Sequence, residues 1–284
     1  MKQFLIVTNR NKDKELETAK WIQNYLQTHG AECTIDVGSK TKGEGYTDAS
    51  LVPKGTECVI VLGGDGTLLQ AAIDLIDTEI PFMGINLGTL GFLAEVDRNG
   101  IPEALQCLLK ENFEIENRMM LHGRSVCGGQ VVDSSHALND IVITRKASLQ
   151  IIHFNIYVNG QLLHHYSADG IIAATPTGST GYNLSAGGPI VNPVANLIVV
   201  TPICPHSMQN RSIVFSAEDK ITIEIESNRE GKGQEVEAIF DGSHKIPLKT
   251  GDYLEICCSE KTTQIVKLRR ESFLEILHKK LGES

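Results

Sequence analysis

One short stretch, residues 61–67 with the sequence Val-Leu-Gly-Gly-Asp-Gly-Thr, constrains the fold of this chain more than any other. The apolar run at residues 58–62 predicts a buried strand, and the apolar spacing over residues 68–76 predicts a helix. A strand, a glycine turn and a helix in direct succession present main-chain N–H groups and a helix N-terminus to a phosphate. The glycines allow the main chain to approach a bulky anion closely.

Asp65 is the unexpected member of this turn, because a carboxylate repels phosphate. Its presence is explained if it binds Mg²⁺, or if it accepts a proton from a hydroxyl group that attacks phosphorus. The alternative is a tight strand-to-helix turn in which Asp65 makes a local hydrogen bond and Thr67 caps the helix. The turn alone leaves both interpretations open.

The first part of the chain alternates predicted strands and helices. Strands are expected at residues 4–8, 33–37, 58–62 and 81–85, and helices at residues 13–29, 68–76 and 101–110. This alternation favours an open, mostly parallel sheet that is covered on both faces, with ligands at the carboxyl ends of the strands. A second glycine loop, residues 86–93, follows one of these strands, so both glycine loops are expected at the same edge.

The pattern changes near residue 112, where short runs rich in β-branched residues begin, such as residues 153–158 before Asn159-Gly160. Asn-Gly after a strand is a strong hairpin signal, and several such runs predict an all-β second domain. We therefore expect an α/β domain at residues 1–111, a β-rich domain at 112–266, and a helix at 267–284 that packs back on the first domain.

Charge and cysteine content narrow the class of protein. The 284-residue chain has a formal net charge of −9, and no basic tract offsets it, which argues against a nucleic-acid partner. Its seven cysteines are scattered without a CxxC pair, which is typical of free thiols in a reducing cytosol. The apolar run near the N-terminus is too short to span a membrane. We expect a cytoplasmic protein with no membrane partner.

Two further stretches are candidates for ligand contacts. Residues 167–189 are dense in Gly, Ser and Thr and supply small hydrogen-bonding groups that suit ribose or phosphate oxygens. They could equally form an elaborate β-turn in which Ser and Thr cap a short helix. Asn139 and Asp140 precede a predicted strand and could accept two vicinal ribose hydroxyls, although adjacent Asn and Asp residues also close turns.

Taken together, these motifs resemble those of the NAD kinase family. The resemblance is carried by Gly63-Gly64-Asp65-Gly66-Thr67, by the loop at residues 86–93, by Asn139-Asp140, and by the stretch from Asp169 to Pro189. It covers about residues 58–241, and the last motif is the specific one, since lipid kinases and phosphofructokinases are similar at the first. The chain departs from the family pattern at Gly181, where the family usually has Ala.

The resemblance implies transfer of a phosphoryl group from ATP, or from polyphosphate, to the 2′-hydroxyl of the adenosine ribose of NAD. It implies a Rossmann-like N-terminal domain, a C-terminal β-sandwich-like domain, Mg²⁺ with the phosphoryl donor, and a homodimer or homotetramer. Asp65 would act on the hydroxyl proton, and Gly66 with its neighbours would hold phosphate. The other implied contacts are Asn139, Asp140, Gln150, Ser167, Asp169, Thr180, Gly181, Tyr182, Asn183, Leu184 and Ser185.

Several alternatives stay open at this point. Gln150 would contact ligand from a neighbouring subunit, and either Ser243 or His244 would contact it after the Asp241-Gly242 turn. A lipid kinase shares the glycine-aspartate turn but needs an apolar groove for its acceptor. A dinucleotide-binding sensor without turnover would use the same residues and would not need Asp65. The sequence decides neither ATP against polyphosphate nor NAD against NADH.

Overall fold

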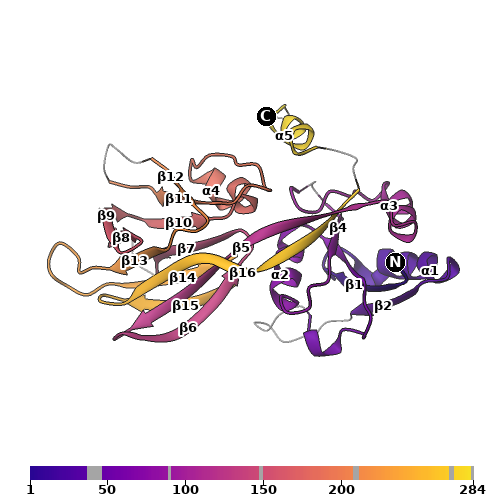
Figure 1. The fold of residues 1–284 in the computed structure, drawn as a ribbon, viewed down its shortest axis with the longest axis horizontal. Helices are drawn as coiled ribbons and strands as arrows, with labels where there is room; N and C mark the ends of the chain where they lie inside the picture. The colour runs from indigo at the N-terminus through magenta and orange to yellow at the C-terminus, as the bar shows by residue number, and fades with distance from the viewer. Residues whose placement is uncertain (37–46, 89–90, 147–149, 207–210, 269–271, 283–284) are drawn as a thin grey trace. The chain divides into compact units, whose positions relative to one another are not determined.

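The computed structural model describes residues 1–36, 47–88, 91–146, 150–206, 211–268 and 272–282 (Figure 1). Thr89 and Leu90, in the second glycine loop, lie outside the described residues. The chain forms two compact units, an α/β unit of Met1–Asn117 with Thr262–Ser284 and a β unit of Arg118–Lys261. Among the described residues, no helix combines the length and hydropathy that crossing a bilayer requires.

The α/β unit is built on parallel strands in the order β2-β1-β3-β4, and the end of β16 lies beside β4. Its strands are β1 (Gln3–Thr8), β2 (Glu32–Asp36), β3 (Cys58–Gly63) and β4 (Phe82–Asn86). Its helices are η1 (Lys14–Leu16), α1 (Glu17–Thr28), η2 (Ala49–Leu51), α2 (Asp65–Asp74), α3 (Ile101–Leu109) and α5 (Phe273–Gly282). The chain passes between the units within β5 (Glu114–Cys127) and β16 (Tyr253–Lys267).

Helices cover both faces of this parallel sheet. One core cluster contains Ile60 of β3 together with Ile22 of α1 and Leu105 of α3. On the opposite face, Leu68 of α2 packs against Gly84 of β4, where a Cβ atom would lie 2.9 Å from the leucine Cδ1. Because both faces are covered, β3 is buried along its whole length, which explains its continuous apolar sequence. The predicted parallel α/β architecture is confirmed.

The β unit is a sandwich of two antiparallel sheets. One sheet contains β16, β13 (Ile221–Ile225), β8 (Ile152–Val158), β9 (Gln161–Ala168), β5 and β6 (Gln130–Ala137). The other has the order β12 (Ile213–Ser216), β11 (Leu197–Ile203), β10 (Gly170–Ala174), β7 (Asp140–Arg145), β14 (Glu235–Phe240) and β15 (His244–Lys249). Side chains such as Phe154 and Phe240 from the two sheets share one core. The predicted hairpin is present, with positive φ at Asn159 and Gly160.

The stretch rich in Gly, Ser and Thr lies on the outer face of the second sheet. After β10 it forms η3 (Thr177–Thr180) and α4 (Tyr182–Ser185). The outer face of the sheet contributes Ile172 and Val199 to a small apolar cluster, and Ala186 and Val191 of the stretch pack against it. This packing holds the turn beside the start of β7 and the end of β10.

Candidate active site

The side chain of Asp65 joins the two glycine loops of the α/β unit. Gly64 is the N-cap of α2, and Asp65 is the first helical residue. Its Oδ2 accepts the N–H of Phe92 at 2.8 Å, and its Oδ1 accepts those of Leu93 at 3.2 Å and Ala94 at 3.0 Å. A Cβ atom on Gly91 would lie 1.9 Å from Oδ1, so only glycine permits this approach. Asp65 therefore fixes the second glycine loop beside the first.

Lys12 is a residue of this edge that sequence analysis missed. A Cβ atom placed on Gly64 would lie 3.1 Å from the Nζ of Lys12, and one placed on Gly88 would lie 3.3 Å from it. The ammonium group is thus next to both glycine loops. The contact follows from the sheet topology: β1 pairs with β3 in parallel, so the residues that follow β1 lie at the same sheet edge as the glycine turn.

In the β unit, the main chain of Asn139 and Asp140 is held by Asp241. The Asp241 carboxylate accepts the N–H groups of Leu138 at 2.7 Å, Asn139 at 2.8 Å and Asp140 at 3.0 Å. Sequence analysis treated Asp241 only as part of a hairpin turn, and the sequence holds no signal for bonds that span 101 to 103 residues. Asp241 fixes the start of β7, where the two candidate ligand side chains project.

The candidate side chains at this position have unused hydrogen-bonding capacity. The Oδ1 atom of Asn139 is buried, and no described residue donates a hydrogen bond to it. Asp140 is only 6% exposed, and burial, with a smaller contribution from the charge of Asp241, raises its pKa to about 7. Burial also raises the pKa of Asp241, which its three main-chain donors partly offset. Buried acceptors of this kind are costly unless a ligand satisfies them.

The hydroxyl-rich turn is fitted closely around Asn139. Thr175 donates its hydroxyl to Leu138 O at 2.6 Å and its N–H to Asn139 O at 2.8 Å. A Cβ on Gly178 would lie 2.0 Å from Asn139 O, which requires glycine there. A Cβ on Gly181 would lie 3.4 Å from Asn139 Nδ2 and 3.8 Å from Asp140 Oδ2, so the structure brings these three predicted residues together.

The predicted contact residues of the short helix α4 lie partly on the surface and partly in the interior. Tyr182 is 48% exposed, Leu184 and Ser185 are exposed, and Thr180 is half-buried. Asn183 is fully buried: its Nδ2 donates to the carbonyls of Ser179 and Pro189 at 3.2 and 3.1 Å, and its Oδ1 accepts the Thr201 hydroxyl at 2.7 Å. The exposed side chains are available to a ligand, whereas the Asn183 side chain holds the turn to the sheet.

The remaining predicted residues have protein partners at the far end of β10. Asp169 pairs with Arg145 at 2.9 Å, and both side chains are about one-quarter exposed. The hydroxyl of Ser167 lies 2.8 Å from Nδ1 of His153. Burial lowers the pKa of His153, which favours the neutral imidazole in this pair.

Gln150 and the residues after Asp241 lie at separate positions. Gln150 is exposed and lines a cavity of about 220 Å³ with Arg145, Lys146 and Gln234. His244 is exposed, and its ring meets that of Phe240 edge-on at 5.8 Å. Ser243, which is also exposed, donates to Phe240 O at 3.4 Å.

A divalent cation would have few protein ligands in the described part of the chain. No three His, Cys, Asp or Glu side chains there are arranged to hold a metal ion. Asp65 lies at the glycine turn, but its oxygens already accept three N–H groups. Mg²⁺ is commonly bound by one or two carboxylates together with substrate phosphates. These residues therefore suit a cation that arrives with the phosphoryl donor rather than a resident one.

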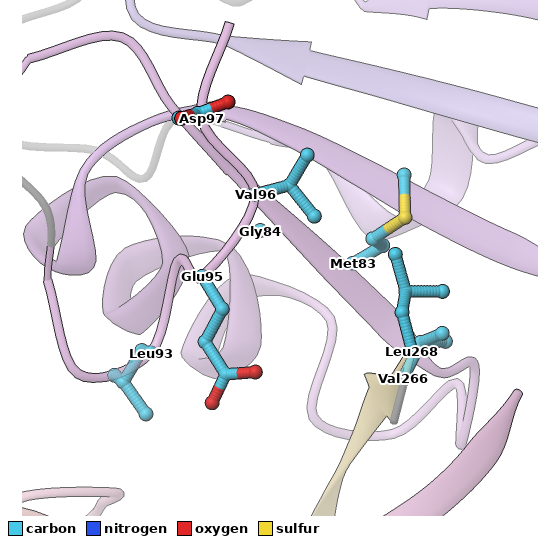
Figure 2. A pocket seen from close by; sticks show the side chains of 8 residues that line it. All are labelled: Met83, Gly84, Leu93, Glu95, Val96, Asp97, Val266 and Leu268. Atoms are coloured by element: carbon cyan, nitrogen blue, oxygen red, sulfur yellow. The ribbon is translucent and has the colours of Figure 1, made fainter. Parts of the chain in front are cut away.

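A pocket of about 120 Å³ lies behind the segment that Asp65 binds. Figure 2 shows Met83, Val266 and Leu268 grouped together in this pocket, with the Glu95 carboxylate apart from them. Glu95 forms an ion pair with Lys267, whose pKa is lowered to about 8 by burial. None of the predicted site residues lines the pocket, and we assign it no part in the site.

The two-unit fold and the family models that match it define the class of protein, a two-domain kinase that acts on a nucleotide. The ATP-NAD kinase N-terminal domain model matches residues 4–113, and the ATP-NAD kinase C-terminal domain model matches residues 138–268. The chain belongs to the NAD kinase family. A protein of Lachnospira eligens named NAD kinase is 47% identical over 99% of this chain and 100% of its own length.

Two solved structures share the fold. Yeast NADH kinase complexed with NADH has a TM-score of 0.85 and 24% sequence identity, over 99% of this chain and 88% of that one. An NAD kinase from Archaeoglobus fulgidus in complex with ATP has a TM-score of 0.79 and 23% identity, over 99% of each chain. The predicted family and the predicted pairing of an α/β with an all-β domain are confirmed.

Proposed function

We propose that this chain transfers the terminal phosphoryl group of ATP, as its Mg²⁺ complex, to the 2′-hydroxyl of the adenosine ribose of NAD. The observation that supports this most strongly is the family match across both domains. The buried acceptors Asn139 Oδ1 and Asp140, beside the small Gly181, supply the polar contacts that a nucleoside needs and a lipid does not. The yeast and Archaeoglobus fulgidus structures hold NADH and ATP, which are ligands of these two classes.

Asp65 acts on the hydroxyl proton in this proposal. A carboxylate offers about four acceptor sites, so three main-chain N–H groups leave one for the acceptor hydroxyl. The bond from the 2′-oxygen to phosphorus forms as the bridging P–O bond of the donor breaks, ADP leaves, and Asp65 accepts the proton. The three N–H groups hold the carboxylate in one orientation, which favours this geometry.

The other residues bind and orient the substrates. The N–H groups at Gly64 and Gly66 receive phosphate at the start of α2, and a divalent cation bound with the donor would neutralise charge on its phosphates. Asn139 and Asp140 accept ribose hydroxyls, and the exposed Tyr182 ring offers a stacking surface. Ser167, Asp169, Thr180, Gly181, Leu184 and Ser185 complete the nucleotide contacts, and the buried Asn183 positions the turn that carries the last four.

The test is NADP formation by the purified protein with NAD or NADH as acceptor and MgATP or polyphosphate as donor. We expect NADP with MgATP, and Asp65→Asn lowers kcat by ~10²–10⁴-fold, the usual contribution of a general base, with little change in NAD affinity. Glu79→Gln, which changes an exposed carboxylate just after α2, is the matched control and keeps wild-type kinetics. A folded protein that binds NAD but makes no product with any donor is instead a sensor.

We also propose a homo-oligomer, a dimer or a tetramer, in a reducing cytosol. The support for oligomers is the exposed Gln150 beside its cavity, which is the position where the family draws a contact from a neighbouring subunit. The support for the compartment is that all seven cysteines are free. Light scattering on the purified protein measures the oligomer, and a monomeric mass at micromolar concentration contradicts it.

A further inference from the structure

The turn after β1 holds Lys12 in a fixed place. The N–H of Asn9 donates to Leu62 O at 2.8 Å, and those of Lys12 and Asp13 both donate to Asn9 O at 2.9 Å. Asp13 is only 3% exposed, and it accepts the N–H groups of Thr18 at 2.9 Å and Ala19 at 3.0 Å. The turn is thus tied to the end of β3 on one side and to α1 on the other, which limits where the lysine side chain can reach.

The ammonium group of Lys12 lies beside the glycine turn, and no carboxylate in the part of the chain that the structure describes neutralises it. Its Nζ is 3.1 Å from the Cβ position of Gly64 and 3.3 Å from that of Gly88. Within the described ranges, no acidic side chain forms an ion pair with Lys12. Asp65, the nearest acid in the sequence of the turn, directs its oxygens to Phe92, Leu93 and Ala94 instead. A solvent-accessible cation therefore faces the turn.

Gly64 and Gly88, the glycines nearest this cation, place no side chain in the space beside it. Neither Gly64 nor Gly88 places a side chain between the ammonium group and the start of α2. The whole chain is acidic, with a net charge of −9, so a polyphosphate donor needs a local positive charge to approach it. A lysine ammonium is a compact point charge that binds phosphate oxygens strongly.

We propose that Lys12 binds the phosphates of the phosphoryl donor and holds them over the glycine turn. This inference rests on the proposed kinase function and adds a binding residue to it. Lys12 contacts the donor alone, so it acts on the KM for the donor more than on the KM for NAD. The charge matters more than the side chain's volume, so arginine substitutes better than methionine.

The experiment compares Lys12→Met, Lys12→Arg and the control Lys14→Met, which removes an exposed lysine from the same turn. Initial rates are measured with MgATP varied at saturating NAD, and then with NAD varied at saturating MgATP. We expect Lys12→Met to raise the KM for MgATP at least ~10-fold, with partial rescue in Lys12→Arg and wild-type values in Lys14→Met. The KM for NAD stays within about twofold of wild type in each variant.

A binding measurement separates this proposal from the kinase function. Calorimetry with MgATP and with inorganic tripolyphosphate measures donor affinity without turnover, and a thermal scan verifies that each variant is folded. Weaker binding of both ligands by Lys12→Met than by Lys14→Met supports the role of Lys12, even for a protein that makes no NADP. Equal affinities and equal KM values in an active enzyme overturn the role of Lys12 and leave the kinase function intact.

Discussion

At the scale of single residues, the position of the Asp65 carboxylate depends on the glycines around it. The carboxylate needs the three N–H groups that follow Gly91, and Gly91 must lack a side chain for those groups to reach it. Asp65 is therefore a structural residue of the loop as well as the proposed acceptor of the hydroxyl proton. Substitutions at neighbouring glycines can separate these two roles, because some displace the carboxylate and others only fill the space in front of it.

Gly91→Ala is expected to displace the Asp65 carboxylate. The new Cβ would lie 1.9 Å from Oδ1, an overlap that neither the loop nor α2 can absorb without moving. Overpacking of this kind costs ~1–3 kcal/mol of folding free energy, and the loss of activity should equal that of Asp65→Asn. Urea unfolding and NADP formation measure the two effects. Gly233→Ala, whose Cβ has ordinary contact with Thr250, is the control. Full activity in Gly91→Ala contradicts this prediction.

Gly66→Ala should move stability and activity in opposite directions. Gly66 lies in the first turn of α2, and a Cβ there meets no atom within 4 Å. Alanine favours a helix over glycine by ~0.5–1 kcal/mol, so the variant is expected to unfold at higher urea. The added methyl group occupies the space through which a phosphate reaches the turn, so the KM for MgATP rises. A stabilised variant with an unchanged KM would exclude phosphate from this position.

At the scale of elements, the start of β7 is held by Asp241, which directly follows the neighbouring strand β14. The N–H groups of Leu138, Asn139 and Asp140 all donate to that one carboxylate. The start of β7 and the end of β14 are therefore held together. The hydroxyl-rich turn adds the Thr175 bonds to the same main chain. These bonds hold a segment rich in small polar residues in one conformation, as the proposed ligand contacts require.

The stability of the β unit should depend on pH through Asp140. Its pKa is raised from 3.8 to about 7 in the folded chain, so the native state keeps a proton that the unfolded state releases. Stability is highest at low pH and falls as the pH rises from about 4 to about 7. Asp140→Asn removes this loss, which is at most ~4 kcal/mol, and the variant gains stability over wild type between pH 5 and pH 8.

Urea unfolding of wild type and Asp140→Asn at pH 5 and pH 8 checks this expectation. Asp241, whose pKa is also raised, keeps part of the pH dependence in the variant. Glu218→Gln, at an exposed carboxylate, is the control and should run parallel to wild type. A difference between Asp140→Asn and wild type that is the same at both pH values contradicts the raised pKa of Asp140. NADP formation should fall in Asp140→Asn because a ribose contact is lost.

The sequence predicted the elements better than it predicted what fixes them. The apolar run of β3 and the Asn159-Gly160 turn carry local signals, and both were located correctly. The predicted helix at residues 13–29 begins only at Glu17, because Glu15 and Leu16 have positive φ and Asp13 bonds to the main chain of α1. Hydrophobic periodicity reports neither a positive φ nor a hydrogen bond from a side chain to the main chain of the following helix.

The candidate site shows the same difference between residues that carry a local signal and contacts that depend on the fold. Asp65 and Asn139 were predicted from the glycine turn and from the start of a strand, and the family resemblance marks both, whereas Lys12 and Asp241 have no motif of their own. Lys12 reaches the glycine turn through the parallel pairing of β1 with β3, and Asp241 reaches Asn139 through the pairing of β14 with β7. Both contacts are consequences of sheet topology, so they require the fold before they can be inferred.

At the scale of the whole molecule, the two units have separate cores and the proposed ligand contacts are divided between them. Cys33 of β2 and Cys58 of β3 lie in the core of the α/β unit, whereas Cys204, just after β11 in the β unit, is exposed. Burial raises the pKa of the thiols of both Cys33 and Cys58 to about 12. The reactivity of the Cys33 and Cys58 thiols can therefore report the opening of the α/β unit separately from that of the β unit.

We expect an aromatic disulfide reagent at pH 8 to label Cys204 first and to leave Cys33 and Cys58 unlabelled while the α/β unit is folded. A thiol with a pKa near 12 is ionised to only about one part in ten thousand at pH 8, and burial excludes the reagent as well. Mass spectrometry of peptides locates the label, and Cys204→Ser should remove the fastest phase. The glycine turn follows β3 directly, so labelling of Cys58 and loss of NADP formation should occur at the same urea concentration. Labelling of Cys58 at a urea concentration that leaves NADP formation intact would contradict this view.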